Sequence, residues 1–292
     1  MTAPLAAGPT WTFDAIGTSW AIETASALNS VARDAVWSVV ERFDREWSRF
    51  RGDSPVSALA EGRVASVPVP SDADAMLSLY DELDAATAGA VNPLIGEALA
   101  RLGYDARVSL VPSGDPAPVP PWRETLTWSD GRLAVARPVT IDVGAVGKGR
   151  LVDLVLDTLR HHVDGDIVVD ASGDMALRGA AVRVALEHPY DATRAIGVVT
   201  VTDGALCASA INRRAWGDGL HHVLDARTGA PVRAFAATWA VADTAMRADA
   251  LATALFFDGG PELAASWNAH WVRMSTDGRV EWSPGFAGEI FA

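Results

Sequence analysis

The chain has 292 residues and a formal net charge of −13, because 37 Asp and Glu outnumber 24 Lys and Arg. Hydrophobic residues make up 49% of it and charged residues 21%, which is typical of a globular protein and excludes disordered, collagen-like and coiled-coil chains. The negative charge argues against nucleic acid or an acidic membrane surface as partner, because both are polyanions. A single cysteine, Cys207, excludes an internal disulfide and a multi-cysteine zinc site.

The N-terminal segment and the apolar runs predict the location of the protein. Met1–Pro9 has neither a basic region nor a long apolar stretch, so we expect no signal peptide there. The chain also contains no run of about 18 apolar residues, the length that a membrane-spanning helix needs. These observations predict a cytoplasmic protein that is not itself a membrane protein.

The first part of the chain alternates between predicted strands and amphipathic helices. Trp11–Thr24 mixes β-branched and aromatic residues around a Gly-Thr break, which predicts an edge hairpin or a bulged strand. Apolar residues at helical spacing predict a helix over Asn29–Arg49 and a second one around Met76–Leu83. Either Ser71 or Asp72 is expected to cap the second helix.

The remainder of the chain is rich in predicted strands. Pro112–Pro121 is expected to be an extended surface loop, and Leu126–Ile141 a hairpin around Asp130-Gly131. Helices are predicted over Lys148–Leu159 and Thr244–Phe257. Further strands are expected at Asp166–Asp170, Met175–Leu186, Ile196–Val201, Ala205–Ser209, His221–Leu224, Phe235–Ala242, Trp271–Ser275 and Val280–Ser283.

Because the strands and helices show no regular βαβ repeat, we predict an α+β fold with mixed or antiparallel sheets and helices packed on them. Residues 1–292 are expected to form a single domain. An arrangement in two lobes, with the ligand site between them, is the alternative.

Thr140–Asp153 (TIDVGAVGKGRLVD) is the first segment that carries chemistry. A predicted strand ends at Asp142, and three glycines with Lys148 open the following helix. Such a turn presents backbone N–H groups to an anion, and the lysine adds a charge that suits phosphate. The segment matches neither the Walker nor the Rossmann pattern. A tight turn with a solvated lysine is the alternative.

Two further segments place polar residues in loops. Ser172-Gly173-Asp174 follows a strand and predicts either a close approach of backbone to a ligand or an ordinary turn. Ala208–Pro231 gathers many polar side chains, among them the pair His221-His222. Neighbouring residues on a strand face opposite sides, so we expect one histidine to be buried and structural and the other to face outward.

The helix over Thr244–Phe257 carries the fourth candidate site. Asp249 and Thr253 are four residues apart and therefore lie on the same helix face. A carboxylate and a hydroxyl on a half-buried face suit Mg²⁺, which prefers oxygen ligands. A capping or packing role for Asp249 is the alternative.

In their order and spacing these segments resemble the ApbE-type flavin transferases, the FAD:protein FMN transferases. The resemblance runs from about Gly17 to about Phe257. It rests on TIDVGAVGKGRLVD, VDASGDMALRG, HHVLDARTGAP, ADALATALF, WSRFRGDSPVSAL and GAVNPLIG. It implies the T-fold-like architecture of that family.

The resemblance also implies an activity and its site residues. Family members cleave FAD and attach FMN through a phosphoester to a Thr or Ser of a target flavoprotein, with release of AMP and a requirement for Mg²⁺. The metal would be held by Asp249, Thr253 and the Ala145 carbonyl, and His222 or Asp249 would accept the proton of the target hydroxyl. The FAD site would be built from Phe50, Ala90, Val91, Asn92, Asp142, Lys148, Gly173, Asp174, Ser209, Asp225 and Thr228.

The chain departs from the family pattern at Ala60, Asn92, Val146-Gly147, the segment 209–212 and Ala226. Two alternatives therefore stay open beside the transferase. In an FAD pyrophosphatase, water would replace the target hydroxyl. A non-catalytic FAD-binding protein would release no AMP. In an acidic protein, binding of the anionic FAD is expected to depend on the metal and on Lys148.

Overall fold

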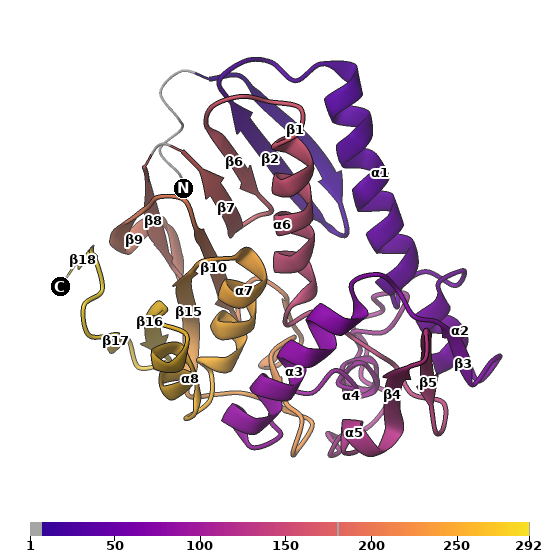
Figure 1. The fold of residues 1–292 in the computed structure, drawn as a ribbon. Coiled ribbons are helices and arrows are strands. Elements are labelled where there is room, and N and C mark those ends of the chain that lie inside the picture. The colour runs from indigo at the N-terminus through magenta and orange to yellow at the C-terminus, as the bar shows by residue number, and fades with distance from the viewer. Residues whose placement is uncertain (1–7, 180, 292) are drawn as a thin grey trace.

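The computed structural model describes residues 8–179 and 181–291 (Figure 1). Most of Met1–Pro9, for which we expect no signal peptide, lies outside this part of the chain. No helix among the described residues has the length and apolar character needed to cross a bilayer.

An eight-stranded sheet organises the molecule, and all of its neighbouring strands are antiparallel. In spatial order the strands are β1 (Thr10–Ala15), β2 (Thr18–Thr24), β6 (Ile167–Asp170), β7 (Asp174–Arg178), β10 (Ala205–Ala210), β15 (Phe235–Ala242), β16 (His270–Ser275) and β17 (Val280–Trp282). Together with the helices packed on it, this sheet confirms the predicted α+β class.

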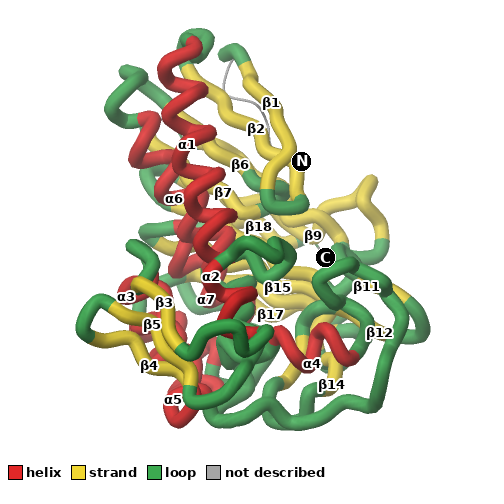
Figure 2. The backbone as a smooth tube through the Cα atoms, turned by 90° about the vertical axis from the view of Figure 1, so that its right-hand side faces the viewer, coloured by secondary structure: helices red, strands yellow, loops and turns green. Residues whose placement is uncertain are grey.

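Four smaller antiparallel sheets surround the main one (Figure 2). They comprise β18 (Gly288–Ile290), β9 (Asp191–Val201) and β8 (Val182–His188); β3 (Ser66–Pro68), β5 (Arg132–Val135) and β4 (Leu126–Ser129); β11 (Ala215–Trp216) and β12 (Leu220–His221); and β13 (Leu224–Asp225) and β14 (Ala230–Pro231). The expected hairpin turn at Asp130-Gly131 joins β4 to β5, and both turn residues have positive φ.

The helices lie largely on one side of the main sheet (Figure 1). They are α1 (Ser30–Trp47), α2 (Pro55–Ala60), α3 (Ala73–Thr87), α4 (Gly96–Arg101), α5 (Trp122–Thr125), α6 (Gly147–Leu159), α7 (Ala245–Ala254) and α8 (Gly260–Ser266). Ile167 and Val169 face the core beneath the helices, whereas Val168 faces a second core with β8 and β9. The centre of the main sheet is therefore buried on both faces, as strand alternation requires.

Helix starts agree with the predictions in part. Asn29 caps α1, because its Oδ1 accepts the Ala32 N–H at 2.9 Å. Asp72 occupies the cap position of α3 but makes no capping bond, because Arg42 and Arg150 occupy its carboxylate at 3.0 and 2.8 Å.

Three predicted strands differ in the structure. No strand leads into Asp142, because the residues before it pair with no sheet. The backbone N–H of Asp142 donates a hydrogen bond to Pro93 O instead. Met175–Leu186 divides into β7 and β8, which belong to different sheets, because the chain turns at Gly179, where φ is +93°. His221–Leu224 likewise divides between the short strands β12 and β13.

Helices α6 and α7 approach each other most closely at Gly149. A Cβ at this position would lie 2.2 Å from Ala245 O and 2.7 Å from Asp249 Cβ. The same contact carries three hydrogen bonds. Gly149 N–H donates to Asp249 Oδ2 at 2.9 Å, and Asp153 accepts the Ala245 and Met246 N–H groups at 2.8 and 2.9 Å. Only glycine at position 149 allows this spacing.

We expect Gly149→Ala to lower the free energy of unfolding by about 2–3 kcal/mol, because the added methyl overpacks the contact between the two helices. Urea unfolding monitored by circular dichroism measures this change. Gly52→Ala is the matched control, because nothing lies within 4 Å of a Cβ there, and its effect should stay within about 1 kcal/mol. Equal unfolding midpoints for the two variants would contradict the packing role.

Candidate functional site

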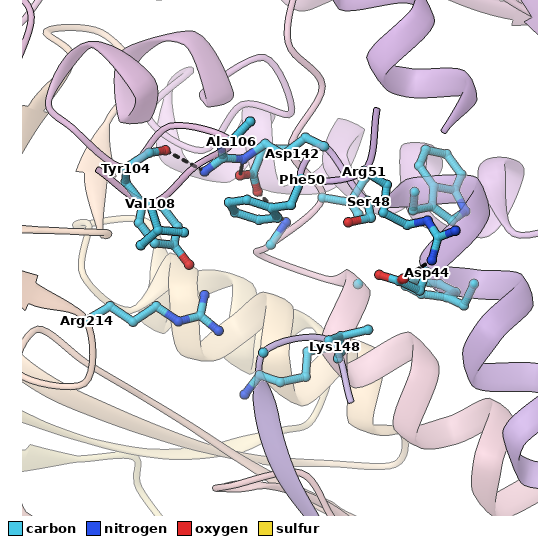
Figure 3. A pocket seen from close by; sticks show the side chains of 18 of the residues that line it. Asp44, Ser48, Phe50, Arg51, Tyr104, Ala106, Val108, Asp142, Lys148 and Arg214 are labelled. Carbon is cyan, nitrogen blue, oxygen red and sulfur yellow. Dashed lines mark hydrogen bonds and ion pairs between the residues drawn. The ribbon is translucent and has the colours of Figure 1, made fainter. Parts of the chain in front are cut away.

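Two adjoining cavities lie where α1, α6 and α7 meet the turn between β1 and β2. The first has a volume of about 540 Å³ (Figure 3) and the second about 400 Å³. Both are lined by Gly17, Tyr104, Asp142, Gly144, Lys148 and Arg214. The cavities therefore adjoin, and we call the region bordered by these shared residues the passage; a ligand long enough to contact both cavities would lie against them.

Lys148 is the central cation of the passage. It extends from the first turn of α6, and its ammonium group forms an ion pair with the buried carboxylate of Asp174. Burial alone would lower the pKa of Lys148, but the carboxylates of Asp174 and Asp249 raise it above the usual value. Lys148 therefore stays charged next to any anionic ligand.

The predicted oxygen ligands meet in the second cavity. Asp249 and Thr253 of α7 and Ala145 of the glycine-rich turn all line it. Burial raises the pKa of Asp249, and the nearby Asp174 carboxylate raises it further. Two buried carboxylic groups thus share the single lysine, and a bound cation would favour the ionised form of Asp249, which burial otherwise disfavours.

The described residues contain no cluster of three or more His, Cys, Asp or Glu that could hold a metal ion. A cation here would therefore depend on one carboxylate together with hydroxyl and carbonyl oxygens. Such a donor set suits a hard ion such as Mg²⁺, which keeps several waters, and does not suit zinc.

The two adjacent histidines have different surroundings, but strand alternation is not the reason, because β12 ends at His221 and His222 follows it in a bend. His221 is buried, and its Nε2 lies 2.9 Å from Val232 O, so its role is structural. His222 is half-buried and lines the second cavity; its Nδ1 is shielded from solvent and has no hydrogen-bond partner among the described residues. Burial and the positive charge of Arg214 lower the pKa of His222 to about 3, so its ring is neutral near pH 7.

Aromatic rings and arginines border the first cavity. Phe50 is 42% exposed, and the Arg49 guanidinium lies 4.2 Å from its ring centroid. Lys148 and Arg214 extend from opposite sides into the space below Phe50 (Figure 3). No described carboxylate forms an ion pair with Arg214, which leaves its charge available to a ligand. The cavity is therefore locally cationic in an acidic protein.

Most predicted site residues line these cavities. Those that do are Phe50, Ala90, Val91, Asn92, Asp142, Ala145, Lys148, Ser209, His222, Asp249 and Thr253. The Asn92 side chain is occupied by backbone, because it donates to Pro120 O at 3.0 Å and accepts from Leu94 N at 2.9 Å. It therefore holds the cavity wall in place.

Four predicted residues lie elsewhere. Asp174 is fully buried behind Lys148, and Gly173 borders a separate small pocket of about 30 Å³. Asp225 and Thr228 line a different hollow of about 450 Å³. The structure does not bring these four residues to the surface of the two cavities, and Asp174 acts on the site through Lys148.

The cavities are also lined by residues that were not among the predicted site residues, and Arg49, Arg214 and Tyr104 are the ones with charged or aromatic side chains at the shared or cationic part of the site. Arg49 directly precedes Phe50 in the sequence, and Arg214 lies in the same polar segment, Ala208–Pro231, as His222. The sequence therefore offered a reason to include both arginines among the candidate site residues. Tyr104 follows α4 in a segment without any motif, and only the fold brings it to the passage.

Several proteins that are similar to this chain in sequence are each named FAD:protein FMN transferase. A Rhodobacter capsulatus protein named FAD:protein FMN transferase is 27% identical over 96% of this chain, which spans only 58% of that protein's length. A Treponema pallidum protein of the same name is 28% identical over 78% of this chain and 71% of its own length.

Solved structures share the fold. The ApbE protein of Thermotoga maritima superposes with a TM-score of 0.80 at 22% identity, covering 96% of this chain and 98% of that one. The flavinyl transferase ApbE of Pseudomonas stutzeri gives 0.75 at 19% identity, covering 96% of both chains. These similarities confirm the predicted ApbE-like architecture. The model of the ApbE family matches residues 16–273, and the chain therefore belongs to the ApbE family.

Proposed function

We propose that the chain is a Mg²⁺-dependent FAD:protein FMN transferase. It would cleave the pyrophosphate of FAD, join FMN through a phosphoester to a Thr or Ser hydroxyl of a target flavoprotein, and release AMP. The observation that carries this proposal is the pair of cavities that meet at Lys148, beside an aromatic ring at one end and oxygen donors at the other. The names of the relatives support the same activity.

The oxygen donors of the second cavity fit Mg²⁺. Asp249, Thr253 and the Ala145 carbonyl are its proposed ligands, and the two buried carboxylates beside one lysine provide the electrostatic reason for a cation. When bound, Mg²⁺ would neutralise pyrophosphate oxygens and make the phosphorus more electrophilic.

The residues of the chain would perform the remaining steps. Lys148 and Arg214 lie where they can neutralise phosphate oxygens, and Phe50 offers an exposed ring to a flat part of the ligand. As the bond between the target oxygen and phosphorus forms and the bond to AMP breaks, the hydroxyl proton needs an acceptor. The unpartnered Nδ1 of neutral His222 is the proposed acceptor, with Asp249 as the alternative.

A transfer assay tests the function directly. Incubated with FAD, Mg²⁺ and a candidate target flavoprotein, the chain should add the mass of one FMN to a Thr or Ser of the target and release AMP in equal amount. Mass spectrometry of the target and chromatography of the nucleotides measure both products. Free FMN and AMP without modified target would favour a pyrophosphatase, and FAD binding without cleavage would favour a non-catalytic protein.

The cytoplasmic location of the protein stays a prediction.

Asp249→Asn should lower the FMN transfer rate about 100-fold, because the only carboxylate of the proposed metal site loses its charge. FAD affinity of the wild type should fall when EDTA is added, and that of the variant should not respond. Asp243→Asn is the control, since Asp243 lies just before α7, is exposed, and forms an ion pair with Arg247 in the first turn of that helix. Equal FAD affinity of the wild type with and without EDTA would count against the metal site.

His222→Asn should lower the transfer rate about 100-fold at every pH from 5 to 8. Because the pKa of His222 is about 3, its ring is already neutral over this range, so the pH profiles of wild type and variant should run parallel. The exposed His162 provides the control substitution His162→Asn. An unchanged rate would remove His222 from the mechanism, and an inflection near pH 6.5 that disappears with His222 would contradict its neutral state.

A further inference from the structure

Arg49 joins segments that are far apart in the sequence. Its side chain is 5% exposed, and its Nε lies 2.5 Å from Asp142 Oδ2, across a separation of 93 residues. Its Nη2 donates to Tyr104 O at 3.0 Å. One buried guanidinium therefore connects the end of α1, the chain after α4 and the turn that leads into α6.

The guanidinium also lies against two aromatic rings that contact each other edge to face. Its Cζ lies 4.2 Å from the ring centroid of Phe50 and 5.1 Å from that of Tyr104. A planar, delocalised cation suits this position, because it can stack on rings while its edge donates hydrogen bonds. Lysine lacks the fork that reaches both oxygen acceptors.

The partners of Arg49 border the passage between the cavities. Asp142 and Tyr104 line both the first and the second cavity. The second Asp142 carboxylate oxygen accepts Gly144 N–H at 2.8 Å, so both oxygens are occupied. Among the described residues, Arg49 is the cation that forms an ion pair with Asp142.

We propose that Arg49 is a positioning residue that cancels the charge of Asp142 at the passage and so allows an anionic dinucleotide to span both cavities. This inference rests on the proposed function, because it assigns the pyrophosphate of FAD to the passage beside Lys148. Without Arg49, a carboxylate that is 14% exposed would carry its full charge against the phosphates.

Stability alone is a weak reason for this ion pair. Burying two charges costs desolvation energy, and apolar residues of similar volume are often equally stabilising or more so. The location of the pair is better explained by electrostatics, since it lies where a ligand with two phosphates would pass from one cavity to the other.

The test measures FAD binding alone, by quenching of flavin fluorescence with Mg²⁺ present and no acceptor protein. Arg49→Met should raise the Kd for FAD at least about 10-fold, and added salt should narrow this difference by screening the freed carboxylate. Arg49→Lys keeps the cation, and the double variant Arg49→Met with Asp142→Asn removes both charges. Arg49→Lys should bind FAD within about threefold of the wild type, and the double variant should bind FAD more tightly than Arg49→Met, because it no longer carries the unpaired carboxylate.

Arg160→Met is the matched control, because Arg160 pairs with Asp157 at the far end of α6 and is exposed. If Arg49→Met fails to fold, Arg49→Gln replaces it, since glutamine keeps a hydrogen-bond donor at this position but carries no charge. Wild-type affinity in the uncharged Arg49 variant, or a double variant that binds FAD no more tightly than Arg49→Met, would overturn this inference while leaving the proposed function intact. A wild-type protein that binds no FAD would overturn both.

Discussion

The site depends on the close contact between α6 and α7 at Gly149. The missing side chain lets Asp249 accept the Gly149 N–H at 2.9 Å, while Asp153 returns two hydrogen bonds to the start of α7. The contact fixes Lys148, one residue before the glycine, relative to Asp249 and Thr253. A wider spacing of the two helices would separate the cation from the oxygen donors and from the carboxylates that keep it charged.

This geometry explains how a protein of net charge −13 can present a site for an anion. Charge acts on a ligand mainly through nearby groups, because salt screens distant ones. At the cavities, Lys148 and Arg214 face inward, and the Asp142 charge is offset by Arg49. The remaining negative charge is concentrated in Asp249 and Asp174, beside the proposed cation, so the acidic residues also serve binding when a metal is present.

Sequence alone predicted the parts of the fold and site that depend on local pattern. The i, i+4 spacing of Asp249 and Thr253 placed them on one face, whereas strand alternation does not explain the different surroundings of His221 and His222, because β12 ends at His221. Pattern could not show which motif residues reach the cavity. Asp225 lies near His222 in the sequence, but a turn between β13 and β14 directs it to another hollow. Long-range partners such as Arg49 and Asp142 become neighbours only in the folded chain.

Several polar residues of the motifs act behind the cavity surface, and this changes how departures from the family pattern are interpreted. Asn92 donates to Pro120 O through its amide nitrogen, which the carboxylate of an aspartate could not do. The asparagine therefore supports the cavity wall through a bond that needs its amide group. Arg49 similarly supplies a charge partner for Asp142 from within a motif segment. Asn92 and Arg49 thus support the walls of the site, while its oxygen donors and Lys148 line the cavities themselves.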